Sequence, residues 1–251
     1  MLGLHERQHG LRALAASVQE ELAPYLRAKA DISAAEIGAF FKRHVDASAA
    51  AAFTLQSLQE HEEQYQRVAT QFPYLVHRVA KLSCPMLEQR YDAERTLSFP
   101  AAGPRKANES LLFHTTRADP VTICAEGLDL RMSMGAAALH KGRGGLLGMG
   151  IYFGNDPAKS DAYGLPSRDG EKFMFVFEVQ LGDCKEYDAP QRDLLREPPK
   201  EAHERAADDP RPEYDSVTAV FSRGREFAIY NSHRCVPRYV VAYSDVHGGR
   251  R

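Results

Sequence analysis

Short β-rich runs, separated by turn-forming and helix-forming residues, fill the last two thirds of the chain and limit its fold more than any other feature. The runs are Tyr74–Leu82, Ser110–Thr115, Gly150–Phe153, Phe173–Leu181, Glu226–Tyr230 and Tyr239–Tyr243. Each has the length and the β-branched or aromatic content of a strand. Between them, Pro85 and Pro120 suit first helical positions, and Asp119 and Asp156 suit N-caps. The pattern predicts a unit of mixed α and β structure over residues 72–251.

Residues 1–71 are instead rich in Ala, Gln, Glu and Leu, and predict an N-terminal helical region. One helical stripe consists of Leu4, Leu11, Leu14, Val18, Leu22 and Leu26. Ser33 and Glu36 form a capping box for a second helix, and a third is expected from about Ser48. The expected buried residues of the third helix are Leu55, Leu58, Tyr65 and Val68. We expect a helical appendage packed on the following domain or on a partner.

Charge and apolar patterning exclude several classes of protein. The chain has 32 Lys and Arg against 34 Asp and Glu, so its charge of −2 does not indicate a nucleic-acid partner, although a local basic patch remains open. No apolar run is long enough to cross a membrane, and the first residues contain no apolar signal core. We therefore expect an intracellular protein with no membrane association. Four widely spaced cysteines are expected to be free thiols.

One zinc motif matches literally, since His5-Glu-Arg-Gln-His9 has the H-E-x-x-H spacing. A zinc site needs a further ligand, and Glu20 and Glu21 would lie roughly 16 Å along the same helix. Glu36 on the next helix is the remaining candidate, but nothing in the sequence places it there. We expect two surface histidines and no metal.

The glycine cluster Gly142–Gly150 invites comparison with a phosphate-binding loop. Such loops follow a strand and open a helix, whereas these glycines lead into the strand-like Ile151–Phe153. A flexible loop is the better interpretation. The sequence also lacks the G-x-S-x-G elbow of a serine hydrolase.

Three polar residues stand at or within expected strands: His114, Tyr152 and Glu226. Taken singly, each has an ordinary explanation. A histidine that ends a strand is usually a structural hydrogen-bonding group, a strand tyrosine usually belongs to the core, and a glutamate at a strand edge is usually solvated. The sequence segments around these three residues favour a functional role for them.

Segments around these residues follow a recognisable order. They are Val76–Tyr91, Asn108–Thr116, Gly127–Arg131, Gly148–Gly154, Ala158–Tyr163, Tyr214–Val217, Glu226–Tyr230 and Val236–Tyr243. Together they resemble the catalytic domain of the poly(ADP-ribose) polymerases, the diphtheria-toxin-like ADP-ribosyltransferases, from about Tyr74 to Tyr243. Asn108-Glu-Ser-Leu-Leu-Phe-His-Thr-Thr116, for example, is similar to Asn-Glu-x-x-Leu-Phe-His-Gly-Thr. The departures are Cys84 for Asn, Thr115 for Gly and Gly154 for Ala.

The resemblance implies an α+β catalytic domain over residues 72–251, built from two packed mixed or antiparallel sheets of the ADP-ribosyltransferase type and preceded by the helical region 1–71. It implies cleavage of the bond between nicotinamide and ribose in NAD, and transfer of ADP-ribose to protein acceptors including the chain itself. NAD is then the substrate, and no metal is implied. The alternatives are ADP-ribosylation of nucleic-acid ends, and a non-catalytic module that binds NAD or ADP-ribose.

The resemblance also assigns residues. The catalytic residues would be His114, Tyr152 and Glu226. The residues that bind NAD would be His114, Thr115, Thr116, Arg131, Tyr152, Ser160 and Tyr163. The carboxylate of Glu226 would stabilise the positive charge that develops on the sugar, hold its 2′-hydroxyl and permit chain elongation.

The other roles divide between the two ends of NAD. His114 would bind the adenosine ribose, and Arg131 the adenosine side or the pyrophosphate, followed by a donor-side loop at 132–149. Tyr163 would stack on nicotinamide opposite Tyr152, and Ser160 would bond its carboxamide. Ser160 and Tyr163 share a helix face at this spacing.

Two further features bear on binding. Thr115 keeps both of its backbone groups but adds bulk, so nicotinamide binding is expected to be weaker or altered, not lost. The acceptor-side loop would include Val220–Arg225, whose arginines either meet an ADP-ribose phosphate or lie in an ordinary solvated turn.

Overall fold

The computed structural model describes residues 34–46, 52–116, 119–131, 145–164, 166, 170–205, 211–221 and 224–245. The His5 and His9 motif, the first helical stripe, Ser33 and residues 132–144 lie outside these ranges. Within them, none of the helices combines the length and the apolar character that a membrane crossing requires. All four cysteines are free thiols.

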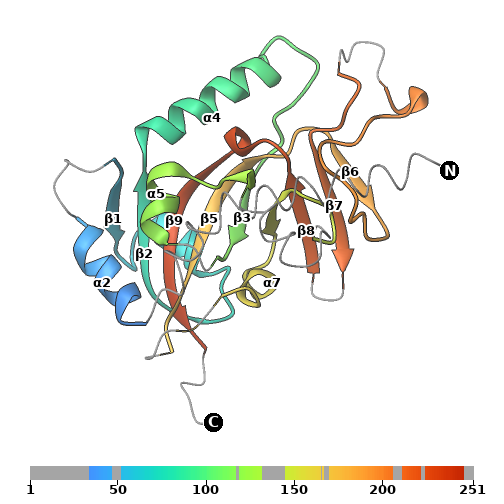
Figure 1. Ribbon diagram of the computed structural model, residues 1–251. Coiled ribbons are helices and arrows are strands. Elements are labelled where there is room, and N and C mark those ends of the chain that lie inside the picture. Colours follow the sequence, from blue (N-terminus) through green and yellow to red (C-terminus); the bar gives the residue numbers. More distant parts are fainter. Residues whose placement is uncertain are drawn as a thin grey trace.

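A nine-stranded sheet, in the order β1-β2-β9-β5-β3-β4-β8-β7-β6, forms the centre of the molecule (Figure 1). Its strands are β1 Thr54–Leu58, β2 Leu75–Ser83, β3 Glu109–His114, β4 Ile151–Gly154, β5 Lys172–Gln180, β6 Cys184–Tyr187, β7 Ser216–Phe221, β8 Gly224–Ile229 and β9 Cys235–Ser244. Neighbouring strands are antiparallel except β6 and β7, which are parallel. The expected α+β class is confirmed.

The sheet has a seam between β3 and β4. Only one residue pair, Phe113 with Gly154, joins these strands, whereas β3 pairs with β5 from Glu109 to His114. The seam separates a five-stranded part, β1-β2-β9-β5-β3, from a four-stranded part, β4-β8-β7-β6. Where two packed sheets were expected, the structure has one continuous mixed sheet with two parts that meet at this seam.

Every β-rich run predicted from the sequence is a strand, but the prediction of one helix was wrong. The helix expected from about Ser48 is replaced over Thr54–Leu58 by β1, which pairs with β2. The residues 1–71 are thus not wholly helical. Leu55 and Leu58 are buried as expected. Their three-residue spacing is typical of one helix face, but in β1 it places them on opposite faces of the sheet, in two different core clusters.

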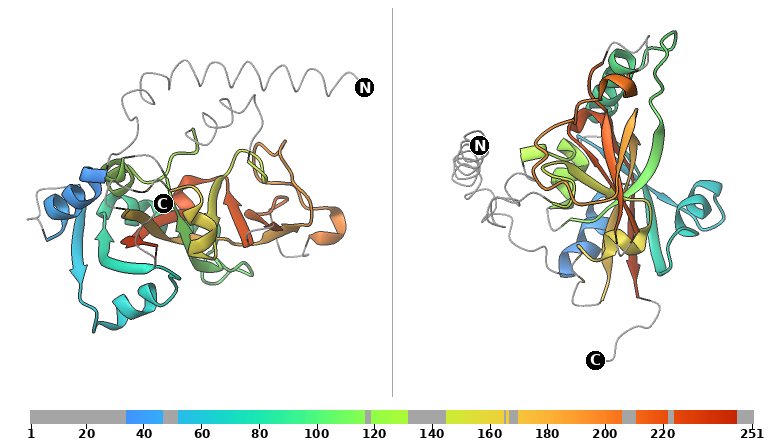
Figure 2. Two further views of the ribbon diagram at one scale, coloured as in Figure 1. Left: turned by 90° about the horizontal axis from the view of Figure 1, so that it is seen from below. Right: turned by 90° about the vertical axis from the view of Figure 1, so that its right-hand side faces the viewer.

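Short helices cover both faces of the sheet. They are α2 Ala34–His44, α3 Glu63–Ala69, α4 Pro85–Ser98, α5 Pro120–Glu126 and α7 Pro157–Asp161. Figure 2 shows α3 on one face and α2 and α5 on the other. The central strand β5 serves both faces, because Phe173, Phe175 and Phe177 enter one cluster while Met174 and Val176 enter the other.

The helix starts predicted at Pro85, at Asp119 and Pro120, and at Asp156 are confirmed. Pro85 and Pro120 begin α4 and α5. Asp119 caps α5 by accepting a hydrogen bond from the backbone N–H of Val121, and Asp156 caps α7 in the same way through Ala158.

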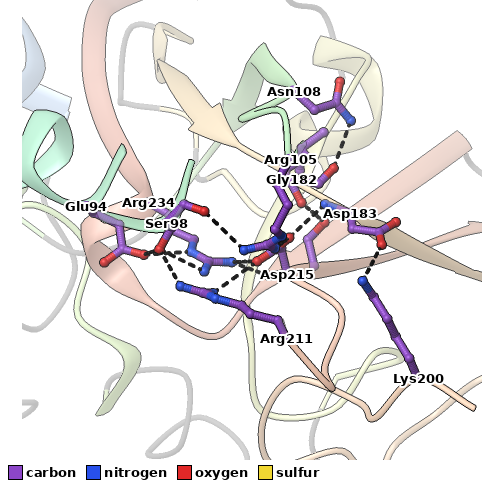
Figure 3. A network of polar contacts seen from close by, with 12 residues as sticks. Glu94, Ser98, Arg105, Asn108, Gly182, Asp183, Lys200, Arg211, Asp215 and Arg234 are labelled. Atoms are coloured by element: carbon purple, nitrogen blue, oxygen red, sulfur yellow. Dashed lines mark hydrogen bonds and ion pairs between the residues drawn. The ribbon is translucent and has the colours of Figure 1, made fainter. Parts of the chain in front are cut away.

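A buried carboxylate before β7 forms the centre of a network of polar contacts (Figure 3). Asp215, which directly precedes β7, accepts hydrogen bonds from Arg105, Arg211 and Arg234. Arg234 lies in the 3-10 helix Ser232–Arg234 and also pairs with Glu94 of α4, with 3.1 Å between Nε and Oε1. The side chain of Asp215 is fully buried, so these bonds replace its contact with water.

Candidate active site

The imidazole of His114 lies at the end of β3, next to the seam. Its Nδ1 is 2.8 Å from the backbone oxygen of Tyr152 in β4. A carbonyl oxygen can only accept, so Nδ1 carries the hydrogen and donates it. Burial lowers the pKa of His114, although the bond to Tyr152 opposes this shift. The ring is therefore neutral near pH 7, with Nε2 as a hydrogen-bond acceptor.

This pKa predicts how stability depends on pH. The unfolded chain binds a proton at His114 up to about pH 6.5, whereas the folded chain binds it only at lower pH. The free energy of unfolding should therefore fall as the pH drops from about 6.5 toward the folded pKa. His114→Asn should reduce this fall, measured by urea unfolding at about pH 7.5 and about pH 5.5. The same substitution at the exposed His61 serves as the reference. An equal fall in parent and His114 variant would contradict the prediction.

The phenol of Tyr152 holds the loop that precedes its own strand. Its hydroxyl accepts from the backbone N–H of Leu147 at 2.8 Å and donates to the backbone oxygen of Gly148 at 2.6 Å. A Cβ at Gly145 would lie 2.5 Å from this hydroxyl, so the loop approaches the ring closely because glycine is present there. Burial raises the pKa of Tyr152, which keeps the phenol protonated. Tyr152 thus shapes the site by fixing residues 145–148.

The carboxylate of Glu226 lies within β8, on the other side of the seam. The residue is only 4% exposed, so it is not the solvated strand-edge residue of the ordinary interpretation. Its Oε1 is 2.7 Å from the Nζ of Lys159 in α7 and accepts a 3.3 Å hydrogen bond from the hydroxyl of Tyr163. Lys159 is itself 6% exposed. The structure therefore joins Glu226 to Tyr163 within one cluster and adds a buried cation to it.

Ser160 and Tyr163 follow Lys159 on one helical turn, since the N–H of Tyr163 bonds to the backbone oxygen of Ser160 at 3.1 Å. The hydroxyl of Ser160 donates to the backbone oxygen of Phe113 in β3 at 3.0 Å. With its hydrogen used in this way, the oxygen of Ser160 can accept an amide N–H, whereas donation to a carboxamide oxygen requires the hydroxyl to rotate. Tyr163 is 57% exposed, which leaves much of its side chain at the surface.

Thr115 stands next to His114 and is buried. A Cβ at position 164 would lie 2.8 Å from the Cγ2 of Thr115, so the absence of a side chain at Gly164 accommodates the threonine methyl group. The bulk that Thr115 adds is thus matched by Gly164. Whether nicotinamide binding is altered by Thr115 stays a prediction.

The groups at the seam suit recognition of a sugar, a flat ring and a developing positive charge. A neutral imidazole acceptor, an exposed aromatic side chain and a buried carboxylate 3.3 Å from that phenol lie along one seam. These groups fit ribose hydroxyls, a flat ring and a sugar carbon that becomes positive, respectively. A family model described as "Poly(ADP-ribose) polymerase catalytic domain" matches residues 55–245.

The chain belongs to this family.

Curated relatives are larger proteins. Protein mono-ADP-ribosyltransferase PARP10 from Mus musculus is 27% identical over 204 residues, which cover 76% of this chain and 20% of the relative. Protein mono-ADP-ribosyltransferase PARP12 from Mus musculus is 28% identical over 194 residues, covering 75% of this chain and 25% of the relative. The human PARP12 shows the same identity and coverage. The chain thus spans a fifth to a quarter of the length of these relatives.

Two further residues of this poly(ADP-ribose) polymerase domain, Thr116 and Arg131, were predicted to bind NAD. Thr116 follows Thr115 and is half-buried. Arg131 forms an ion pair with Asp129, with 2.6 Å between Nη2 and Oδ2, and its side chain is 74% exposed. Roles for both toward NAD stay predictions.

The expected acceptor-side loop joins β7 to β8. Arg225 pairs with Glu186 of β6, with 2.8 Å between Nη2 and Oε1, while Val220 is exposed. Residues 222–223 lie outside the described ranges. The interpretation of this loop as a phosphate contact stays a prediction.

Lys159 is the residue of the site that the sequence analysis missed. It directly precedes Ser160 in the segment that resembles the family motif, and this position was the one available signal. Lysine is seldom fully buried, and nothing in the spacing links it to a glutamate on a distant strand. Only the placement of α7 against β8 shows the pair.

Proposed function

We propose that this chain is an NAD-dependent ADP-ribosyltransferase that attaches single ADP-ribose units to protein acceptors. The observation that carries the proposal is the buried carboxylate of Glu226, which shares one cluster with Tyr163 and lies across the seam from the neutral imidazole of His114. Family membership and the names of the relatives support the same activity.

In the proposed reaction, NAD supplies a glycosidic bond whose leaving group is a cationic pyridine ring. We propose that His114 accepts a hydrogen bond from an adenosine ribose hydroxyl at Nε2, and that Tyr163 packs on the nicotinamide ring. Glu226 would accept a hydrogen bond from the 2′-hydroxyl of the reacting ribose and stabilise positive charge on the anomeric carbon of that ribose as the bond to nicotinamide breaks. The bonding electrons leave with nicotinamide, an acceptor side chain bonds to the same carbon, and the proton of that side chain passes to Glu226 or to solvent.

Lys159 would act on this chemistry through position. Its ammonium fixes the carboxylate of Glu226 through a 2.7 Å contact, so the carboxylate is oriented before the substrate arrives.

Chain elongation, which Glu226 permits, gains no support from the relatives, because all three are named as mono-ADP-ribosyltransferases. We therefore propose single transfer. Modification of the chain itself is part of the proposal, and a protein acceptor is preferred over nucleic acid because the net charge is −2.

The test is incubation with NAD labelled in its adenylate part, with parallel measurement of released nicotinamide. Label that migrates with protein as a discrete band, together with equimolar nicotinamide, is the expected result. A ladder or smear of label would instead indicate elongation. Nicotinamide release with no labelled protein would indicate hydrolysis, and binding of NAD with no release would favour the non-catalytic module.

A further inference from the structure

Three consecutive side chains of α7 contact different strands of the sheet. Lys159 pairs with Glu226 of β8, Ser160 donates to Phe113 of β3, and Asp161 binds partners on β5 and β9. Successive helical residues point about 100° apart, which allows this divergence. A helix of five residues is unstable alone, so its position depends on such contacts.

Asp161 contacts two strands of the five-stranded part. Its two oxygens lie 2.8 Å and 3.0 Å from the Nζ of Lys172 in β5. Oδ1 also accepts a 2.8 Å hydrogen bond from the hydroxyl of Tyr243 in β9. Both ends of the ion pair are largely buried, with side chains 18% and 11% exposed. Burial and then the charge of Asp161 raise the pKa of the neighbouring Tyr74 to about 12.

These contacts place α7 across the seam. Lys159 holds the helix to the four-stranded part, while Ser160 and Asp161 hold it to the five-stranded part. Figure 1 shows α7 at the lower end of the sheet, between β5 and β8. Because only one backbone pair joins β3 to β4, side chains of α7 strengthen the connection there, in addition to the bond from His114 to the backbone of Tyr152.

We propose that Asp161 is a positioning residue for the nicotinamide end of the NAD site. It acts through α7, which carries Lys159 and Ser160 and leads directly into Tyr163. The inference rests on the proposed function, since it concerns the substrate of that function. His114 does not depend on α7 in the same way, because its imidazole is held by the backbone of β4.

The proposal therefore separates the two halves of the ligand. Loss of the Asp161 charge should disturb the residues that meet nicotinamide and leave the adenosine end intact. A residue that merely stabilised the fold would weaken the binding of both halves or of neither. Nicotinamide and ADP-ribose are the two probes that report on these ends separately.

The experiment compares parent, Asp161→Asn and Tyr243→Phe by calorimetry with nicotinamide and, separately, with ADP-ribose. We expect Asp161→Asn to raise the Kd for nicotinamide about tenfold, equivalent to about 1.4 kcal/mol, and to change the Kd for ADP-ribose less than twofold. Tyr243→Phe removes one donor to Asp161 and should shift the Kd for nicotinamide in the same direction by a smaller factor. This second variant answers the question even where Asp161→Asn does not fold. Steady-state kinetics should show the KM for NAD rising more than kcat falls.

Glu94→Gln is the matched control, because Glu94 is also a largely buried partner of a cation but lies at the far end of the sheet. It should lower thermal stability without changing either Kd. Unchanged nicotinamide affinity in folded Asp161→Asn, or equal loss of both affinities, would overturn the positioning role while the proposed function stands. A parent chain that binds neither probe and releases no nicotinamide from NAD would overturn the proposed function and this inference with it.

Discussion

Glu226→Gln should reduce nicotinamide release from NAD by roughly 10²–10³-fold, the usual loss when one preorganised electrostatic contact is removed from an active site. Glutamine keeps the shape of the side chain and its ability to accept from Tyr163, so the charge is the main change. The measurement is steady-state release of nicotinamide. Glu186→Gln is the matched control, because Glu186 pairs with Arg225 on the neighbouring edge and is 61% exposed at its side chain.

The buried pair with Lys159 calls for a second variant. Removing one partner of such a pair leaves an uncompensated charge and typically costs about 3–5 kcal/mol of stability. The double variant Glu226→Gln with Lys159→Met removes both charges, so it should recover stability without recovering activity. Recovery of activity together with stability would show that Glu226 acts only on the fold, and activity undiminished in Glu226→Gln would refute its assignment as the catalytic carboxylate.

Asp215→Ala should lower the free energy of unfolding by about 3–5 kcal/mol, because it leaves buried guanidinium groups without their carboxylate. Arg234 and Arg105 are the affected partners, with side chains only 3% and 9% exposed. Urea unfolding measures the change, and Asp193→Ala, at an exposed position, is the control. A loss below about 1 kcal/mol would mean that solvent or other groups compensate these arginines, as is typical of surface ion pairs.

The sequence predicted local structure best where one segment decides its own conformation. Proline and aspartate at helix starts, and the continuous apolar run of β5, required no knowledge of the rest of the chain. The prediction failed at β1, because Leu55 and Leu58 fit a helix until β2 is beside them. Polar β6 has no apolar alternation and is a strand only through its pairing with β7.

The site shows the same division. His114, Tyr152 and Glu226 were found through an ordered resemblance. The structure joins His114 to the backbone of Tyr152 across the seam and places Glu226 on β8, the strand paired with that of Tyr152. Lys159 and Asp161 could not be found in this way. Their partners, Glu226 and Lys172, lie on different strands, and only the seating of α7 across both parts of the sheet brings each pair together.

The single backbone pair between β3 and β4 has a consequence for how such a domain can diversify. Main-chain hydrogen bonds fix each half of the sheet internally, whereas the halves are joined to each other mostly by side chains, including those of His114, Phe153 and Ser160. Substitutions of such side chains can therefore shift one half against the other without breaking a strand pair within either half.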